Sequence, residues 1–203
     1  MFTLRLISRY LIIVLAIAVV GYAAMYFNFK PINFVASKPV ELINSGIWRT
    51  CFYLHLAGGS VALLIGPFQF IDRFRNRYRA THRFLGKTYV IAILISGLAG
   101  VYLALFASTG LVASLGFAGL AIAWLFTTGQ AYRWAHRRKW NVHKVWMIRS
   151  FAITLAAVTL RIYLPLFLVG FQLPFSTAYP IIAWLCWVPN LFVAEALIRR
   201  DAV

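Results

Sequence analysis

Three histidines stand in or beside the apolar segments of this sequence, and their spacing is suited to binding a haem. His82 and His143 each mark the entry to a long apolar run, and His55 lies inside another run. Histidines at matching depth on different transmembrane helices can ligate the iron of a b-type haem from its two sides. We favour His82 and His143 as that pair. A second haem lacks a complete pair, because only His55 falls on the opposite side of the membrane.

Arg161 is the one charged residue in the apolar stretch 150–171. A charge at that depth costs about 3 kcal/mol on insertion scales, so the side chain should face protein or water. Two interpretations stay open. The arginine is either a structural cation, satisfied by helix carbonyls and by hydroxyls such as those of Thr154 or Thr159, or it binds an anionic or carbonyl group of a quinone or a haem propionate. With His55 at a similar level, it would form an outer polar pocket.

Other polar residues complete this hypothesis. Arginines pair well with haem propionates, and we expect Arg83, Arg149 and Lys144 in that role. Steps of three and four residues place small and polar side chains on one face of a helix, where a flat ligand or another helix can approach closely. The residues on that face are His55, Gly59, Ala62, Gly66 and Gln69.

Each of these residues also has a simpler interpretation. The histidines beside so many arginines fit interfacial positions, hydrogen-bonded to loop backbone or lipid headgroups, and we prefer this for His136 within AHRRK. Helix packing is the commoner reason for a row of small residues. Glu195 is expected to pair with Arg149 or another loop arginine. Zinc is disfavoured against haem, because no His/Cys/Asp cluster has ligand spacing.

The elements that must position these residues are transmembrane helices. Of the 203 residues, 63% are hydrophobic and 12% charged, with a mean hydropathy of +0.81. So much apolar surface cannot be buried inside a water-soluble protein of this size, and the composition therefore indicates an integral membrane protein. The net charge of +16 falls in short connections between apolar segments, which excludes a nucleic-acid-binding surface and favours a signal for membrane orientation.

The pattern predicts an all-α polytopic bundle that forms a single transmembrane domain over residues 1–203. One side of the membrane would receive 16 basic residues, and the other would keep only Lys30 and Lys38. Because positive residues concentrate on the cytoplasmic side, both termini are expected there. The six predicted spans are residues 6–27, 47–70, 88–106, 111–132, 146–171 and 179–198.

Three motifs, HLAGGSVALLIGPFQF, THRFLGKTYV and HKVWMIRSFAITLAAVTLRIYLP, resemble a bacterial family of predicted membrane proteins called domain of unknown function 2306. The resemblance covers residues 50–170. It implies a multi-pass protein of the bacterial cytoplasmic membrane, without indicating a substrate. A looser likeness connects the chain with small di-haem b-type membrane cytochromes, which move electrons between quinols and other carriers. The positions matching the family signature are His55, Gly58, Gly66, Gln69, His82, Arg83, Gly86, Tyr89, His143, Trp146, Met147, Arg149 and Arg161.

We therefore expect a membrane protein that binds haem b or a quinone and takes part in electron transfer. Its expected partners are the lipid bilayer and a redox partner or quinone. The alternative is a non-catalytic transport, sensing or assembly protein, in which the same residues line a cavity for a small ligand, lipid or proton. The predicted binding residues are His82 and His143, as iron ligands, together with His55, Arg161, Arg83, Arg149 and Gln69.

Overall fold

The computed structural model describes residues 2–28 and 33–200, and the side chains of residues 10–28 and 35–200. This described part is helical and contains no β-strand, so the all-α prediction is confirmed. It holds six helical stretches that are long and apolar enough to cross a membrane. They are Tyr10–Asn28, Gly46–Gln69, Arg79–Ala104, Leu111–His136, Trp140–Gly170 and Phe175–Arg200.

Several helices extend beyond the predicted spans at their polar ends. The third span was predicted to begin at residue 88, and its helix begins at Arg79; the fifth was predicted to begin at residue 146, and its helix begins at Trp140. The hydropathy of the sequence marks only the part within hydrocarbon. Arginine and lysine are good helix formers, so the helices continue into the basic connections.

The chain divides into two compact units, residues 1–99 and 100–203, and the division falls within the third span. Each unit is therefore described by itself. The single transmembrane domain and the cytoplasmic placement of both termini stay predictions. Lys30 and the side chains of Arg5 and Arg9, which belong to the count of basic residues, lie outside the described residues.

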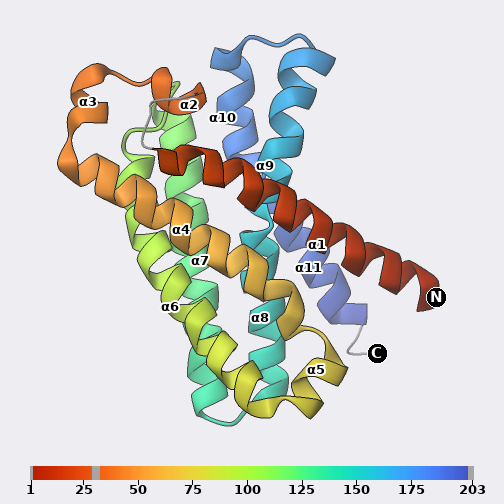
Figure 1. Ribbon diagram of the computed structural model, residues 1–203. Coiled ribbons are helices and arrows are strands. Elements are labelled where there is room, and N and C mark those ends of the chain that lie inside the picture. Colours follow the sequence, from red (N-terminus) through yellow and green to blue (C-terminus); the bar gives the residue numbers. More distant parts are fainter. Residues whose placement is uncertain (1, 29–32, 201–203) are drawn as a thin grey trace. The chain divides into compact units, whose positions relative to one another are not determined.

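The first unit is built around α4 (Gly46–Gln69). Helix α1 (Phe2–Ala24) packs against α4 and runs beside it in Figure 1. Aromatic side chains pack nearby: Phe52 stacks on Trp48 with ring centroids 5.3 Å apart and meets Tyr26 edge-on at 5.7 Å. Ser45 caps α4 by accepting a hydrogen bond from the Trp48 backbone N–H. The other elements are η1 (Met25–Asn28), α2 (Asn33–Ala36), α3 (Val40–Asn44), α5 (Asp72–Arg77) and α6 (Arg79–Ala104), the last up to Ala99.

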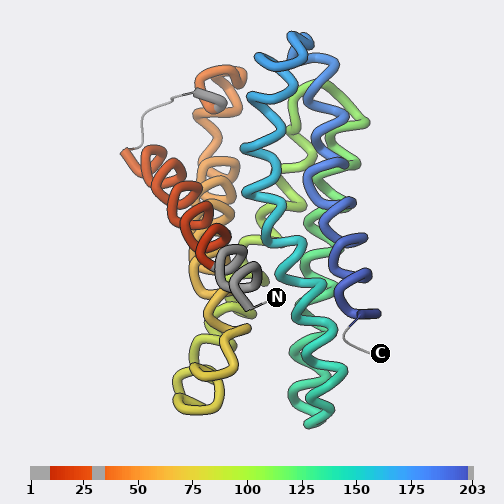
Figure 2. The backbone as a smooth tube through the Cα atoms, turned by 90° about the vertical axis from the view of Figure 1, so that its right-hand side faces the viewer, coloured from red at the N-terminus to blue at the C-terminus, as the bar shows by residue number. Residues whose placement is uncertain are grey.

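In the second unit three long helical stretches run side by side (Figure 2). Its buried core lies between the fifth and sixth spans and contains Ala156, Ala178, Ile182 and Cys186, surrounded by larger apolar side chains such as Phe117 and Leu160. The elements are α7 (Leu111–His136), α8 (Trp140–Thr154), α9 (Ala156–Pro165), the π-helical turn η2 (Leu166–Gly170), α10 (Phe175–Leu185) and α11 (Val188–Arg200).

The fifth and sixth spans are both interrupted in the second unit. Helix α8 ends at Thr154 and α9 begins at Ala156, while α10 ends at Leu185 and α11 begins at Val188. In the sixth span Pro189 supplies the cause, because proline has no N–H and its ring clashes with the carbonyl four residues earlier. The hydropathy pattern predicts both spans as continuous, so neither interruption was predicted from the sequence.

The two interruptions are joined by side-chain hydrogen bonds. Asn190 donates through Nδ2 to the carbonyl oxygens of Ala152 and Cys186, each at 3.1 Å. Thr159 also donates its hydroxyl to the Cys186 carbonyl. Backbone groups released from a helix within a membrane need such partners, since no water is present to replace them.

Candidate functional site

His143 lies in the first turns of α8 and is fixed by a neighbouring helix. Its Nδ1 is 2.8 Å from the carbonyl oxygen of Ala131 on α7. A carbonyl can only accept, so Nδ1 carries the hydrogen, and a neutral ring keeps its lone pair on Nε2. The ring is half-buried and meets Trp140 edge-on, with centroids 6.5 Å apart. The hydrogen bond therefore fixes the orientation of the His143 ring. In the neutral ring, Nε2 is the nitrogen that can bind a metal or accept a proton.

His55 is held in a similar way within the first unit. Its Nδ1 donates to the backbone oxygen of Ser96 on α6 at 2.9 Å, and the Ser96 hydroxyl donates to the His55 carbonyl at 2.8 Å. These reciprocal bonds need the two backbones to be close. Gly58 provides that approach, because a Cβ there would lie 2.6 Å from the Ala92 carbonyl oxygen and 2.8 Å from the Ser96 Cβ.

His82 lies near the start of α6, far from the contact between His55 and Ser96. Fourteen residues separate His82 from Ser96 on this helix, which corresponds to about 21 Å at 1.5 Å per residue. His55 and His82 therefore cannot ligate one iron, in agreement with their assignment to different membrane levels. His82 belongs to the first unit and His143 to the second. Their pairing stays a prediction.

Gln69 is the last residue of α4 and lies beside the N-terminal part of α6. Its side chain is 6% exposed, and both its amide nitrogen and its amide oxygen lack a hydrogen-bond partner among the described residues. The oxygen lies 3.8 Å from the position that a Cβ on Gly86 would occupy. Burying an unpaired amide costs about 1–3 kcal/mol, so this group calls for an additional partner.

Arg149 forms a bidentate ion pair with Glu195 in the second unit. Its Nε and Nη2 donate to the two carboxylate oxygens of Glu195 at 2.6 and 3.0 Å, and its guanidinium carbon lies 4.5 Å from the ring centroid of Trp146. Glu195 was predicted to pair with Arg149 or another loop arginine, and the structure shows that its partner is Arg149. A bidentate pair directs the arginine towards the carboxylate, which weakens the case for Arg149 as a propionate partner.

Arg161 lies on α9, half-buried, and donates from Nη1 to the carbonyl oxygen of Ala157 at 2.8 Å. This contact agrees with the interpretation in which helix carbonyls satisfy the charge. Eighteen residues separate Arg161 from His143 along the fifth span, or about 27 Å of helix. The two residues therefore belong to separate levels, and a shared pocket of Arg161 with His55 stays a prediction.

A buried row of hydroxyl groups between α7 and α8 was not identified from the sequence. The hydroxyl groups of Thr128 and Ser150 form a hydrogen bond of 2.7 Å, and the Trp124 indole N–H donates to the Thr154 hydroxyl at 2.9 Å. All four side chains are buried. Ser150 and Thr154, four residues apart in an apolar segment, were the available signal, because residues at this spacing share a helix face.

The sequence of this chain matches one family of known proteins. A family model described as predicted membrane protein (DUF2306) matches residues 52–198. The chain belongs to this family. In this DUF2306 protein the matched region includes His55, Gln69, His82, His143 and Arg161. Searches of the curated proteins and of the solved structures found no match to the chain. The likeness to di-haem cytochromes gains no support from these comparisons.

Proposed function

We propose that this integral membrane protein binds a b-type haem through His143 and takes part in electron transfer. The observation that supports the proposal is the hydrogen bond from His143 Nδ1 to the Ala131 carbonyl oxygen. Metal-binding histidines usually donate their second ring nitrogen in this manner, which fixes the tautomer and makes the ligating nitrogen more basic. A haem bound there would supply reversible one-electron chemistry.

The chain's other polar groups suit the same ligand. The second iron ligand predicted from the sequence is His82, followed directly by the exposed Arg83, which is suited to a propionate. Arg149 is engaged by Glu195, so Arg83 is the preferred propionate partner in the proposal. His55, held by Ser96, has the same tautomer as His143, and the sequence predicts it at another membrane level.

The visible absorption spectrum of the purified protein tests this function. The protein is expressed with ample haem supply, and we expect a Soret band that is lost in His143→Ala and in His82→Ala. His136→Ala is the matched control, because His136 is an exposed histidine near the same end of the second unit, and it should retain the band. A colourless wild-type protein, or an equal loss in His136→Ala, would overturn the proposal. A colourless protein would favour the non-catalytic alternative.

Gln69 favours a second candidate ligand, a quinone. A quinone carbonyl can accept a hydrogen bond from the buried amide, which has no partner among the described residues. Organic extraction of the purified protein, followed by chromatography, should then release a quinone from the wild type and much less from Gln69→Leu. Leucine keeps a similar volume without the hydrogen bonds. Equal quinone content in both proteins would exclude Gln69 as the binding group.

A further inference from the structure

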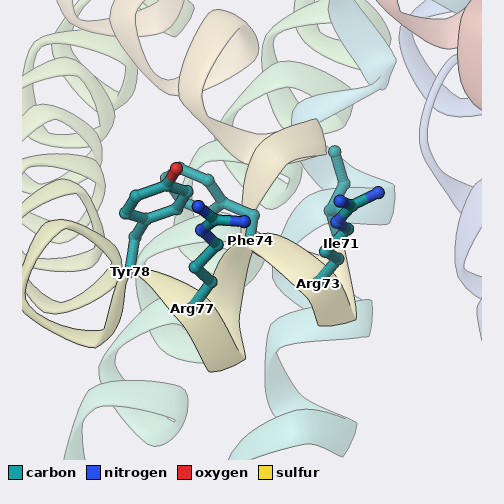
Figure 3. Close-up of a pocket in the computed structure, with 5 residues that line it drawn as sticks. All are labelled: Ile71, Arg73, Phe74, Arg77 and Tyr78. Atoms are coloured by element: carbon teal, nitrogen blue, oxygen red, sulfur yellow. The ribbon is translucent and has the colours of Figure 1, made fainter.

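A hollow beside α5 has the chemistry of an anion site and lies apart from the residues discussed above. Its volume is about 330 Å³, and it is lined by Ile71, Arg73, Phe74, Arg77 and Tyr78. In Figure 3 the Arg77 side chain lies against the rings of Phe74 and Tyr78, and Arg73 extends beside Ile71. The guanidinium carbon of Arg77 is 5.6 Å from the Tyr78 ring centroid.

The positive charge of this hollow is not neutralised by the nearest acid. Asp72 is the only acidic residue between positions 70 and 90, and it forms an ion pair with Arg75 at 2.7 Å. Arg75 is not among the residues that line the hollow. Arg73 and Arg77 therefore bring two positive charges into it. Guanidinium groups recognise phosphate oxygens well, because their planar N–H donors match that geometry.

The position of the hollow in the chain indicates where its ligand comes from. Helix α5 connects the spans Gly46–Gln69 and Arg79–Ala104, so it lies next to the membrane surface. Phospholipid phosphates are concentrated at that level, and anionic lipids attract basic residues beside transmembrane helices. Ile71 and Phe74 are partly buried, whereas Arg73, Arg77 and Tyr78 are exposed. Apolar side chains near a charged surface suit a lipid, which presents acyl chains as well as a phosphate.

We propose that the hollow lined by Arg73, Arg77 and Tyr78 binds the phosphate headgroup of an anionic phospholipid. This site is independent of the haem and quinone proposals, because it shares no residue with them. The lipid would attach the connection between the second and third spans to the membrane surface. The binding is expected to depend on these two arginines, beyond the general positive charge of the chain.

Binding of short-chain phosphatidylglycerol to the delipidated full-length protein tests the site, with short-chain phosphatidylcholine and inorganic phosphate as comparisons. Arg73→Gln combined with Arg77→Gln should weaken phosphatidylglycerol binding about thirtyfold, from the usual attraction of two juxtamembrane arginines. Arg138→Gln with Lys139→Gln removes the same charge from an exposed loop of the other unit and should change the affinity less than about threefold.

Three results would overturn the proposal: equal affinities for the two lipids, equal losses in the two double variants, or inorganic phosphate binding as tightly as phosphatidylglycerol. Arg73→Lys with Arg77→Lys keeps the charge and guards against a folding defect in the glutamine variant. Because lysine lacks the planar donor pair, this variant should bind at least about threefold more weakly than wild type. Wild-type affinity in the lysine variant would indicate diffuse charge attraction and contradict the site.

Discussion

Replacing Gly58 by alanine tests whether the close contact of α4 with α6 is required by the fold. An added Cβ would lie 2.6 Å from the Ala92 carbonyl oxygen, whereas ordinary contacts begin at 3.4 Å, so the backbones would have to separate by about 0.8 Å there. The neighbouring Gly59 is a matched control. Its Cβ would meet only the Ser96 hydroxyl oxygen, at 3.6 Å, which is ordinary contact.

The difference in stability between the two variants isolates this packing effect. Both substitutions gain the same helix propensity, about 1 kcal/mol, because alanine replaces glycine within one helix. Overpacking costs about 1–3 kcal/mol, and Gly58→Ala should be less stable than Gly59→Ala by that amount. It should also disturb the His55–Ser96 hydrogen bonds, which lie one turn away.

Unfolding of both variants in the same detergent, followed by tryptophan fluorescence and gel filtration, measures this difference. We expect a lower unfolding midpoint for Gly58→Ala and a midpoint at or above the wild-type value for Gly59→Ala. Equal midpoints would show that α4 and α6 are not in close backbone contact at this level. The reciprocal hydrogen bonds of His55 and Ser96 would then also lose their geometric basis.

Two further predictions concern the second unit. Arg149→Ala and Glu195→Ala, alone and combined, should give a coupling energy of about 1 kcal/mol, because the pair is bidentate but partly exposed; coupling near zero in the double-mutant cycle would contradict this. Asn190→Ala should lower the unfolding free energy by about 1–2 kcal/mol, because carbonyls at the helix interruptions lose their donor. Asn141→Ala, at an exposed position, should leave it unchanged, and equal effects of the two asparagine variants would refute the assigned role of Asn190.

The fold could be predicted from the sequence because hydropathy depends on composition over long stretches. The small-residue face of the second span was predicted correctly in part: Ala62, Gly66 and Gln69 are buried. Gly58, three residues after His55 and four before Ala62, was not included in that face, although a Cβ there would come within 2.6 Å of the Ala92 carbonyl oxygen. Helical periodicity predicts only which broad side of a helix faces its neighbour, and the adjacent Gly58 and Gly59 both belong to that side. Only the positions of both helices decide which glycine is required.

The candidate site could be predicted less completely. The pairing of Glu195 with a loop arginine could be predicted from charge and depth, since few acids are available to so many arginines, but only the structure identifies Arg149 as the partner. The carbonyl partners of His55 and His143 could not be predicted, because every residue has a backbone oxygen and the sequence does not distinguish one from another. The helix interruption at Leu155 could not be predicted either, because no proline or glycine stands next to Leu155 in the sequence.

The two helix interruptions of the second unit divide it into two tiers. Helix α9 packs on α10 on one side of the interruptions, and α8 packs on α11 on the other. The bonds of Asn190 and Thr159 join the fifth and sixth spans at the boundary between the tiers. The fifth and sixth spans are therefore interrupted at the same level, whereas α7 packs on elements of both tiers without a break. Asn190 supplies three of the hydrogen bonds at that boundary, to Ala152, Thr159 and Cys186, so its loss should loosen the connection between the two spans there.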